Sequence, residues 1–214
     1  MRTPLTAMRG LIEPLKDGLV KDEATRQRYY DIIMRETLRL SRLINDIMEL
    51  SRLQSGTTFI KREVFDPRGE IYDIAARYSA LAEEHGLKLI TSDDIKQLPP
   101  VSFNQDRLEQ ILVILLDNAI KYTEKGSVTL SCCVCNEKVA IRVRDTGMGI
   151  SAENLPHIFE RFYKVDKAHS GMGSGLGLSI ASEVLETMGE SIRVCSEEGK
   201  GTEFTFTMKR AKNG

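Results

Sequence analysis

The spacing of apolar residues changes near residue 55, and this change divides the chain into two parts. Before it, apolar side chains recur every three or four residues, which is typical of amphipathic helices. After it, segments with helical spacing alternate with segments in which every second residue is apolar, the period of a half-buried strand. The polar stretch Ser55-Gly56-Thr57-Thr58 separates the two patterns. We therefore expect two domains, residues 1–56 and 57–214.

The first part is expected to form two helices. The apolar face of the first contains Leu5, Met8, Ile12, Leu15 and Leu19. Pro14 and Gly18 weaken this helix and leave its ends undefined. The second helix runs from about Asp22 to Leu53, with an apolar stripe at Ile33, Leu40, Ile44 and Ile47. Two helices cannot bury two such stripes alone, so we expect a helical hairpin that dimerises into a four-helix bundle. The alternative is a hairpin packed on its own second domain.

The second part is expected to be a mixed sheet with helices on one face, an α/β sandwich. Helices are predicted over residues 66–85, 104–122 and 174–188. Strands are predicted over residues 87–90, 127–135, 138–144, 192–196 and 202–208. Because strands first alternate with helices and then pair as hairpins, the sheet should contain both parallel and antiparallel neighbours. The fold class expected for the whole chain is α+β, a helical hairpin followed by this α/β sandwich.

The charge balance argues against a nucleic-acid partner. The 214 residues contain 30 Lys and Arg and 31 Asp and Glu, interspersed, with no basic stripe. The longest apolar run, Ile111 to Leu116, is far too short to span a bilayer, and there is no signal segment at the start. We expect a cytoplasmic protein core, with any membrane anchor supplied by upstream segments.

Three of the four cysteines lie in Cys132-Cys133-Val134-Cys135. One interpretation is a metal or redox site. The other is a strand, because Val128, Leu130, Cys132 and Val134 alternate onto one face. No second cysteine pair and no histidine lies nearby in the sequence, so the strand is favoured.

Two glycine-bearing segments have the chemistry of a nucleotide site. Asp145-Thr146-Gly147-Met148-Gly149-Ile150 directly follows a predicted strand, and Gly173-Ser174-Gly175-Leu176-Gly177-Leu178 opens a predicted helix. Neither has the spacing of a Walker loop or a dinucleotide fold. A helix N-terminus preceded by glycines presents free N–H groups that suit phosphates. An aspartate at a strand end can accept a hydrogen bond from a flat ligand.

A third segment, Asp117-Asn118-Ala119-Ile120-Lys121-Tyr122, lies in a predicted helix. Asn118, Lys121 and Tyr122 share one face of that helix. Their amide oxygen, ammonium group and ring could ligate Mg²⁺, pair with a phosphate and line a base pocket. The alternative is a surface ion pair between Asp117 and Lys121 beside a solvated asparagine.

The motifs together resemble those of bacterial sensor histidine kinases. The segments LLDNAIKYT, DTGMGI, IFERFYKVD and GSGLGLSIA resemble, in order, the asparagine box, first glycine box, phenylalanine box and second glycine box of that family, and GKGTEFTF resembles its closing hairpin. The resemblance implies an ATP-binding domain of the GHKL type behind a dimerising, histidine-phosphotransfer hairpin. It implies two-component signal transduction, in which the γ-phosphoryl of Mg–ATP passes to a histidine and then to an aspartate of a response regulator.

The resemblance also implies roles for individual residues. Asn118 would ligate Mg²⁺, Lys121 would lie near the phosphates and Tyr122 against the adenine. Asp145 would accept the exocyclic amine of adenine. The other residues implied in nucleotide binding are Gly147, Gly149, Ile150, Phe159, Gly173, Gly175, Leu176, Gly177, Leu178 and Thr202.

Residues 151–172 would form a lid over the nucleotide, from which Arg161 and Lys164 would reach the phosphates as catalytic groups. Many members of the family have a second asparagine where this chain has Ile114. An isoleucine there leaves no side chain to activate water, which favours phosphoryl transfer over hydrolysis.

The opening residues Met1-Arg2-Thr3-Pro4-Leu5-Thr6 resemble the end of the family's phosphoacceptor motif, His-Glu-Leu-Arg-Thr-Pro-Leu-Thr. The acceptor histidine would then lie two residues upstream of Met1, and Thr3 would help to position water for dephosphorylating a response regulator. We therefore expect a homodimer that binds Mg–ATP and a receiver domain but does not phosphorylate itself. The alternative is a regulatory nucleotide-binding module without kinase activity.

Overall fold

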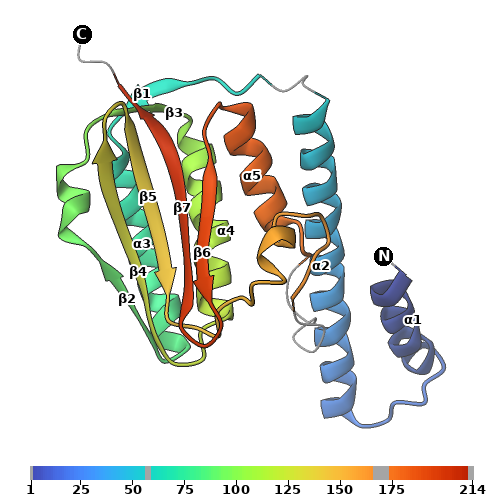
Figure 1. Ribbon diagram of the computed structural model, residues 1–214. Helices are drawn as coiled ribbons and strands as arrows, with labels where there is room; N and C mark the ends of the chain where they lie inside the picture. Colours follow the sequence, from blue (N-terminus) through green and yellow to red (C-terminus); the bar gives the residue numbers. More distant parts are fainter. Residues whose placement is uncertain (1, 56–58, 166–173, 212–214) are drawn as a thin grey trace. The chain divides into compact units, whose positions relative to one another are not determined.

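The computed structural model describes residues 2–55, 59–165 and 174–211 (Figure 1). Within these residues the chain forms two compact units, Met1–Ser51 and Arg52–Gly214. The division falls inside the second helix, a few residues before the boundary predicted at residue 56. The last turn of that helix belongs to the second unit, where Leu53 is buried and the Gln54 amide donates to Glu183 over 3.1 Å.

The first unit is a helical hairpin, as the apolar spacing predicts. Helix α1 spans Arg2–Lys16 and α2 spans Glu23–Gln54. The Asp22 carboxylate caps α2 by accepting the backbone N–H of Thr25 over 2.8 Å. Pro14 lies inside α1, and Gly18 has a positive φ of 69° just beyond its end. The helix thus continues through Pro14, and the left-handed backbone at Gly18 ends it and starts the connection to α2.

The second unit contains a seven-stranded mixed sheet in the order β1-β3-β7-β5-β4-β2, with β6 also paired to β7. Its strands are β1 (Glu63–Phe65), β2 (Leu87–Thr91), β3 (Val101–Phe103), β4 (Gly126–Cys135), β5 (Lys138–Asp145), β6 (Ile192–Glu197) and β7 (Gly201–Arg210). Among the strand pairs in the described residues, β2–β4 is parallel and the other pairs are antiparallel. Strand β7 is central, because it pairs with β5 along one edge and with β3 and β6 along the other.

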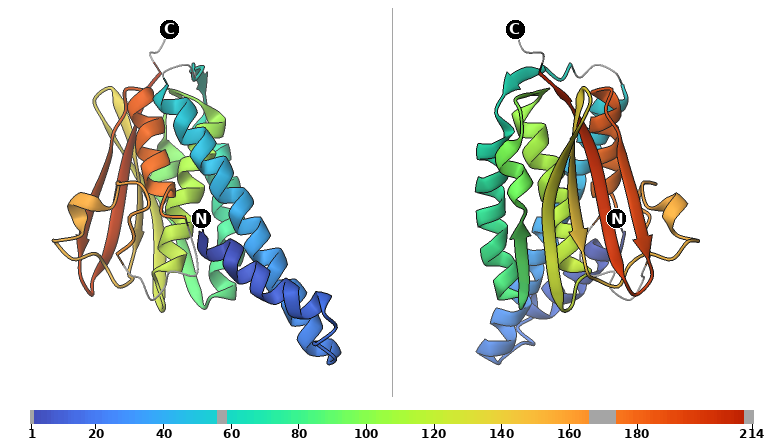
Figure 2. Two further views of the ribbon diagram at one scale, coloured as in Figure 1. Left: turned by 90° about the vertical axis from the view of Figure 1, so that its right-hand side faces the viewer. Right: turned by 60° about the vertical axis from the view of Figure 1, so that its left-hand side comes forward.

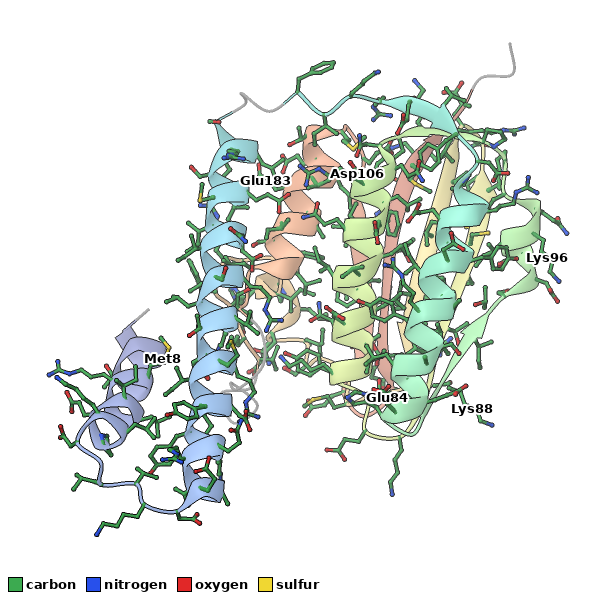
Figure 3. All side chains as sticks on the ribbon, turned by 180° about the vertical axis from the view of Figure 1, so that it is seen from behind. Met8, Glu84, Lys88, Lys96, Asp106 and Glu183 are labelled. Carbon is green, nitrogen blue, oxygen red and sulfur yellow. The ribbon has the colours of Figure 1, made fainter. Side chains whose placement is uncertain are left out.

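Three helices cover one face of this sheet, as the view from behind shows (Figure 3). They are α3 (Pro67–Glu84), α4 (Gln105–Lys121) and α5 (Gly177–Thr187). Asp66 and Asn104 cap α3 and α4 through their side chains. The core lies between these helices and the inward residues of β4, β5 and β7, with Leu115, Ile141 and Phe206 fully buried. None of these three helices lies over the opposite face of the sheet (Figure 2).

Two strands and two short 3-10 helices, η1 (Asp93–Gln97) and η2 (Leu155–His157), were not predicted. The strands β1 and β3 are only three residues long, too short for a period of two to be recognised. Helix α5 begins at Gly177, three residues later than predicted. Gly175 has a positive φ of 75°, and its carbonyl accepts the N–H of Phe162 over 2.9 Å, so the backbone before Gly177 is held outside a helix.

The structure confirms the strand interpretation of the cysteine segment. In β4 the side chains of Val128, Leu130 and Cys132 are buried against the helices. Burial and the nearby Asp94 raise the pKa of the Cys132 thiol to about 12, so this thiol is unreactive at neutral pH. Cys133 and Cys135 lie on the opposite, solvent-facing side of the strand.

Candidate functional site

Asp145, the last residue of β5, is 5% exposed. Its Oδ1 accepts two backbone N–H groups, from Gly147 over 2.8 Å and from Thr202 over 3.2 Å. Burial raises the pKa of this carboxyl group, and the two N–H donors oppose part of that rise. The backbone therefore fixes the orientation of the carboxylate before any ligand arrives.

The second carboxylate oxygen of Asp145 is left for a ligand. Among the described residues, Oδ2 has no hydrogen-bond partner. No fully buried side-chain oxygen or nitrogen in that part of the chain lacks a partner, so Oδ2 must reach solvent. A buried, oriented carboxylate with one accessible oxygen is an acceptor for an N–H or amine group of a ligand.

Glycines let three backbone segments meet around this carboxylate. A Cβ on Gly147 would lie 2.2 Å from the Tyr122 carbonyl oxygen. A Cβ on Gly149 would lie 2.1 Å from the Glu197 carbonyl oxygen, and one on Gly201 would lie 2.1 Å from the carbonyl oxygen of Asp145. Each position therefore requires glycine for close backbone approach. The first glycine box, the end of α4 and the β6–β7 hairpin form one packed unit.

Thr202 joins the hairpin to the site through its side chain as well. It is buried, and its hydroxyl lies 2.9 Å from the hydroxyl of Ser196, its partner across the β6–β7 ladder. The Ser196 hydroxyl accepts the backbone N–H of Ile150 over 2.8 Å. Sequence reasoning missed Ser196, although the predicted hairpin register places it opposite Thr202. The backbone N–H of Ile150 therefore ties the first glycine box to the β6–β7 hairpin.

The end of α4 brings together the three residues of the asparagine box. The Lys121 ammonium donates to the Tyr122 hydroxyl over 2.9 Å and lies 4.5 Å from the centre of its ring. The half-buried Asn118 side chain makes no hydrogen bond to any residue that the structure describes. Asp117, which the alternative interpretation pairs with Lys121, instead accepts the Tyr78 hydroxyl over 2.8 Å.

The phenylalanine box lies between β5 and α5 in the sequence and packs on the sheet. Phe159 is half-buried and meets Phe204 of β7 edge-on, with ring centroids 6.4 Å apart. Arg161 is exposed, and Lys164 is half-buried. The hydrogen bond from the N–H of Phe162 to the Gly175 carbonyl joins the two ends of the segment between them. The central part of the predicted lid, residues 166–173 with Gly173, lies outside the described residues.

The second glycine box passes into α5 beside α4. A Cβ on Gly177 would lie 3.3 Å from Cγ2 of Ile114, so the start of α5 packs closely on that side chain. Leu176 is fully buried and belongs to the core, whereas Leu178 is half-buried. Ile114 thus fills space against α5, where a polar side chain would be poorly solvated. Thr3 lies in α1, in the first unit.

Among the described residues, no helix is long and apolar enough to cross a bilayer. No group of three or more His, Cys, Asp or Glu residues is placed to hold a metal ion there.

Comparisons with known proteins agree with the two units. Residues 1–56 match the family described as His Kinase A (phospho-acceptor) domain, and residues 103–212 match the family described as Histidine kinase-, DNA gyrase B-, and HSP90-like ATPase. The chain is 34% identical to Sensor protein SrrB of Staphylococcus aureus (strain NCTC 8325 / PS 47) over 213 residues, which is 98% of this chain. It spans 36% of the length of SrrB.

Solved structures show the same architecture. Full-length ShkA in complex with AMPPNP superposes with a TM-score of 0.75 and 30% identity, over 89% of this chain and 40% of that one. The Acinetobacter baumannii histidine kinase AdeS superposes with a TM-score of 0.78 over 99% of this chain and 97% of that one, and at 24% identity it supports the fold. The chain belongs to the sensor histidine kinases of bacterial two-component systems.

Proposed function

We propose that the second unit binds Mg–ATP and that the chain transfers the γ-phosphoryl group to a histidine, from which it passes to an aspartate of a response regulator. The observation that carries this proposal is the Asp145 carboxylate, held by two backbone N–H groups with Oδ2 accessible. That oxygen is suited to accept the exocyclic amine of adenine. Gly147 and Gly149 would allow the flat base to approach the backbone.

Asn118 fits the role of a magnesium ligand. Mg²⁺ prefers oxygen ligands and usually keeps several waters, with few ligands from the protein. The Asn118 amide has no partner in the described part of the chain, so its oxygen is available without breaking a hydrogen bond. When bound, the ion would neutralise charge that develops on the phosphates.

The phosphates would lie between α4 and the start of α5. Lys121 offers a positive charge from α4, and Arg161 and Lys164 offer two more from the segment that precedes α5. The first N–H groups of α5 have no carbonyl partner within the helix, and such groups suit an anion. In the transfer, an imidazole nitrogen would attack the γ-phosphorus and ADP would leave. The task of the chain's own residues is therefore to orient the phosphates and to stabilise their charge.

Replacing Asp145 with asparagine separates ligand binding from stability. The asparagine oxygen can keep the two backbone N–H bonds, but its NH₂ group then faces the adenine amine, donor against donor. We expect ATP affinity to fall by about 10- to 100-fold, equivalent to about 1–3 kcal/mol. Calorimetric titration would measure it, with Asp117→Asn, which keeps the acceptor for Tyr78, as the control. Unchanged affinity in Asp145→Asn would contradict the proposed adenine contact.

The same variant should not lower thermal stability at neutral pH. The folded pKa of Asp145 is raised above its unfolded value, so its contribution to stability is full below the unfolded pKa and is lost as the pH rises through the folded pKa. At neutral pH the ionised carboxylate therefore bears a burial cost that asparagine lacks. We expect the melting temperature of Asp145→Asn to equal or exceed that of the wild type at pH 7, and this advantage to disappear on acidification.

We further propose that the hairpin dimerises through an exposed stripe on α2. The stripe consists of Tyr30, Met34, Leu38, Ile44 and Met48, which are 44% to 61% exposed. Their spacing places them on one side of the helix. The stripe differs from the predicted one: Ile44 is common to both, whereas Ile33, Leu40 and Ile47 are half-buried. A second copy of the chain, with the same stripe, would cover it.

Charges introduced into this stripe should dissociate the dimer. We expect the double variant Met34→Asp, Leu38→Asp to raise the dimer dissociation constant at least about 100-fold. Each replaced side chain removes about 1.5–3 kcal/mol of stabilisation from apolar burial, and each copy carries both replacements. Light scattering over a dilution series would measure it. Arg28→Asp, on the opposite side of α2, is the control and should leave the dimer intact. A dimer unaffected by the double substitution would place the interface elsewhere.

A further inference from the structure

The outer face of β4 carries two thiols in contact. Cys133 and Cys135 are two residues apart and point to the same side of the strand, with their Sγ atoms 4.0 Å apart. Cys135 is exposed and Cys133 is half-buried. The helices α3, α4 and α5 cover the other face of the sheet and do not lie over this one (Figure 1). The nucleotide-binding proposal does not use this pair.

The sulfur separation fits two thiolates bound to one metal ion. Sulfurs bound to a single ion at about 2.3 Å can lie no more than about 4.6 Å apart. A separation of 4.0 Å corresponds to an angle of about 120° at the ion, using that bond length. An ion with only two thiolate ligands prefers a nearly linear arrangement, which rotation of the Cys133 and Cys135 side chains reaches without movement of the strand.

A disulfide fits this strand less well. Residues two apart in a strand have Cα atoms about 6.6 Å apart, near the upper end of the range of about 4.4–6.8 Å seen in disulfides. The sulfurs would also have to approach from 4.0 Å to about 2.0 Å. Strand β4 resists that bend, because Cys133 and Cys135 are paired in register with Ala140 and Lys138 of β5. The ladder thus favours an ion between the sulfurs over a bond between them.

The surroundings select a soft, monovalent ion. Within the described residues no third His, Cys, Asp or Glu completes a group with the pair, so an ion that needs four protein ligands is disfavoured. Arg142 of β5 pairs in register with Ser131 and lies on the same face of the sheet as Cys133, so it brings a permanent positive charge to that face. Two thiolates with one monovalent ion carry a net charge of −1, which Arg142 would offset. With a divalent ion the complex would be neutral, and Arg142 would have no charge to offset.

We propose that Cys133 and Cys135 form a binding site for one Cu(I) ion. Thiolates are the ligands that Cu(I) prefers. Binding converts two thiols and Cu⁺ into a bis-thiolate complex and releases two protons, with no change in oxidation state. The ion would tie together the last residues of β4, next to the β4–β5 turn.

Titration of the reduced chain with Cu(I) under anaerobic conditions, in competition with a chromogenic Cu(I) chelator, tests the proposal. We expect one tightly bound ion per chain and an affinity that rises with pH. Cys133→Ser and Cys135→Ser should each lower the affinity at least about 100-fold. Cys195→Ser removes an exposed thiol on β6, which is separated from β4 by β7 and β5, and should behave as the wild type.

Three results would overturn the proposal. The first is a Cu(I) affinity of the wild type that is no higher than the affinity of Cys133→Ser or of Cys135→Ser. The second is loss of the ion in Cys195→Ser. The third is tight one-to-one binding of Zn²⁺ through the same pair, which would refute selection for a monovalent ion. Mass spectrometry of the chain before titration verifies that both thiols are reduced, because a disulfide lowers the mass by two hydrogens.

Discussion

Alanine at position 147 will abolish measurable ATP binding and destabilise the second unit. Its Cβ would lie 2.2 Å from the Tyr122 carbonyl oxygen and 2.9 Å from Oδ1 of Asp145. The Tyr122 carbonyl is itself fixed, because it accepts the N–H of Met148 over 3.1 Å. The turn must therefore open, and the N–H of residue 147 will no longer hold the carboxylate. We expect a loss of about 2–4 kcal/mol in the free energy of unfolding.

Three further glycine substitutions separate steric overlap from backbone strain. Gly69 in α3 has open space around it, so alanine there should be neutral or stabilise by up to about 1 kcal/mol. Gly86 also has open space but a positive φ of 72°, so alanine should cost about 1–2 kcal/mol and leave ATP affinity unchanged. Gly149 combines a positive φ of 68° with overlap, and alanine there should be at least as damaging as at Gly147.

Urea denaturation and calorimetric ATP titration of the four variants provide the measurements. If Gly147→Ala costs no more stability than Gly86→Ala, the close approach of the backbone at Tyr122 is not a constraint. If Gly147→Ala retains wild-type ATP affinity, the orientation of Asp145 by the N–H of residue 147 is unimportant for ATP binding.

Apolar spacing was sufficient to predict the main helices and the hairpins of the sheet, because each buries one continuous face. It was insufficient where the chain is held by contacts distant in the sequence. The start of α5 is set by the bond between Phe162 and Gly175, and β3 exists because it pairs with the end of β7. A local period contains no information about such partners, so Gly177 as the first helical residue could not be predicted.

The motifs identified the residues of the candidate site, and the structure adds how they are supported. Thr202 lies 57 positions from Asp145, yet its backbone N–H donates to that carboxylate. The resemblance implied only that Thr202 takes part in nucleotide binding, and the structure adds its backbone N–H bond to Asp145 and its hydroxyl contact with Ser196. Ser196 is one polar residue among several in an alternating strand, so only the strand register reveals its contact.

The cysteine segment shows that a strand and a ligand site do not exclude each other. The period of two correctly predicted that Cys132 is buried in a strand. The same period places Cys133 and Cys135 together on the other face, which makes them neighbours. Treating strand and ligand site as alternatives concealed this consequence of strand geometry.

Phosphoryl transfer to a separate histidine-bearing hairpin is the second large effect expected. The three histidines of the chain, His85, His157 and His169, all follow α2 in the sequence. With radiolabelled ATP and Mg²⁺, we expect label to appear on a separate helical hairpin that carries the complete His-Glu-Leu-Arg-Thr-Pro motif, and not on this chain. Transfer depends mainly on positioning and charge stabilisation, and the residues proposed for both lie between Asn118 and Thr202.

The rate will be low, because a separate hairpin lacks the high effective concentration that covalent linkage provides. Two controls fix the interpretation. A hairpin with glutamine in place of the histidine should take up no label, and Asn118→Ala in this chain should reduce labelling of the intact hairpin at least about 100-fold. Label on this chain alone would mean that the acceptor has been wrongly identified. If ATP binds but the intact hairpin stays unlabelled at saturating concentration, the chain is a regulatory nucleotide-binding module, because binding and transfer would then be separable in the same protein.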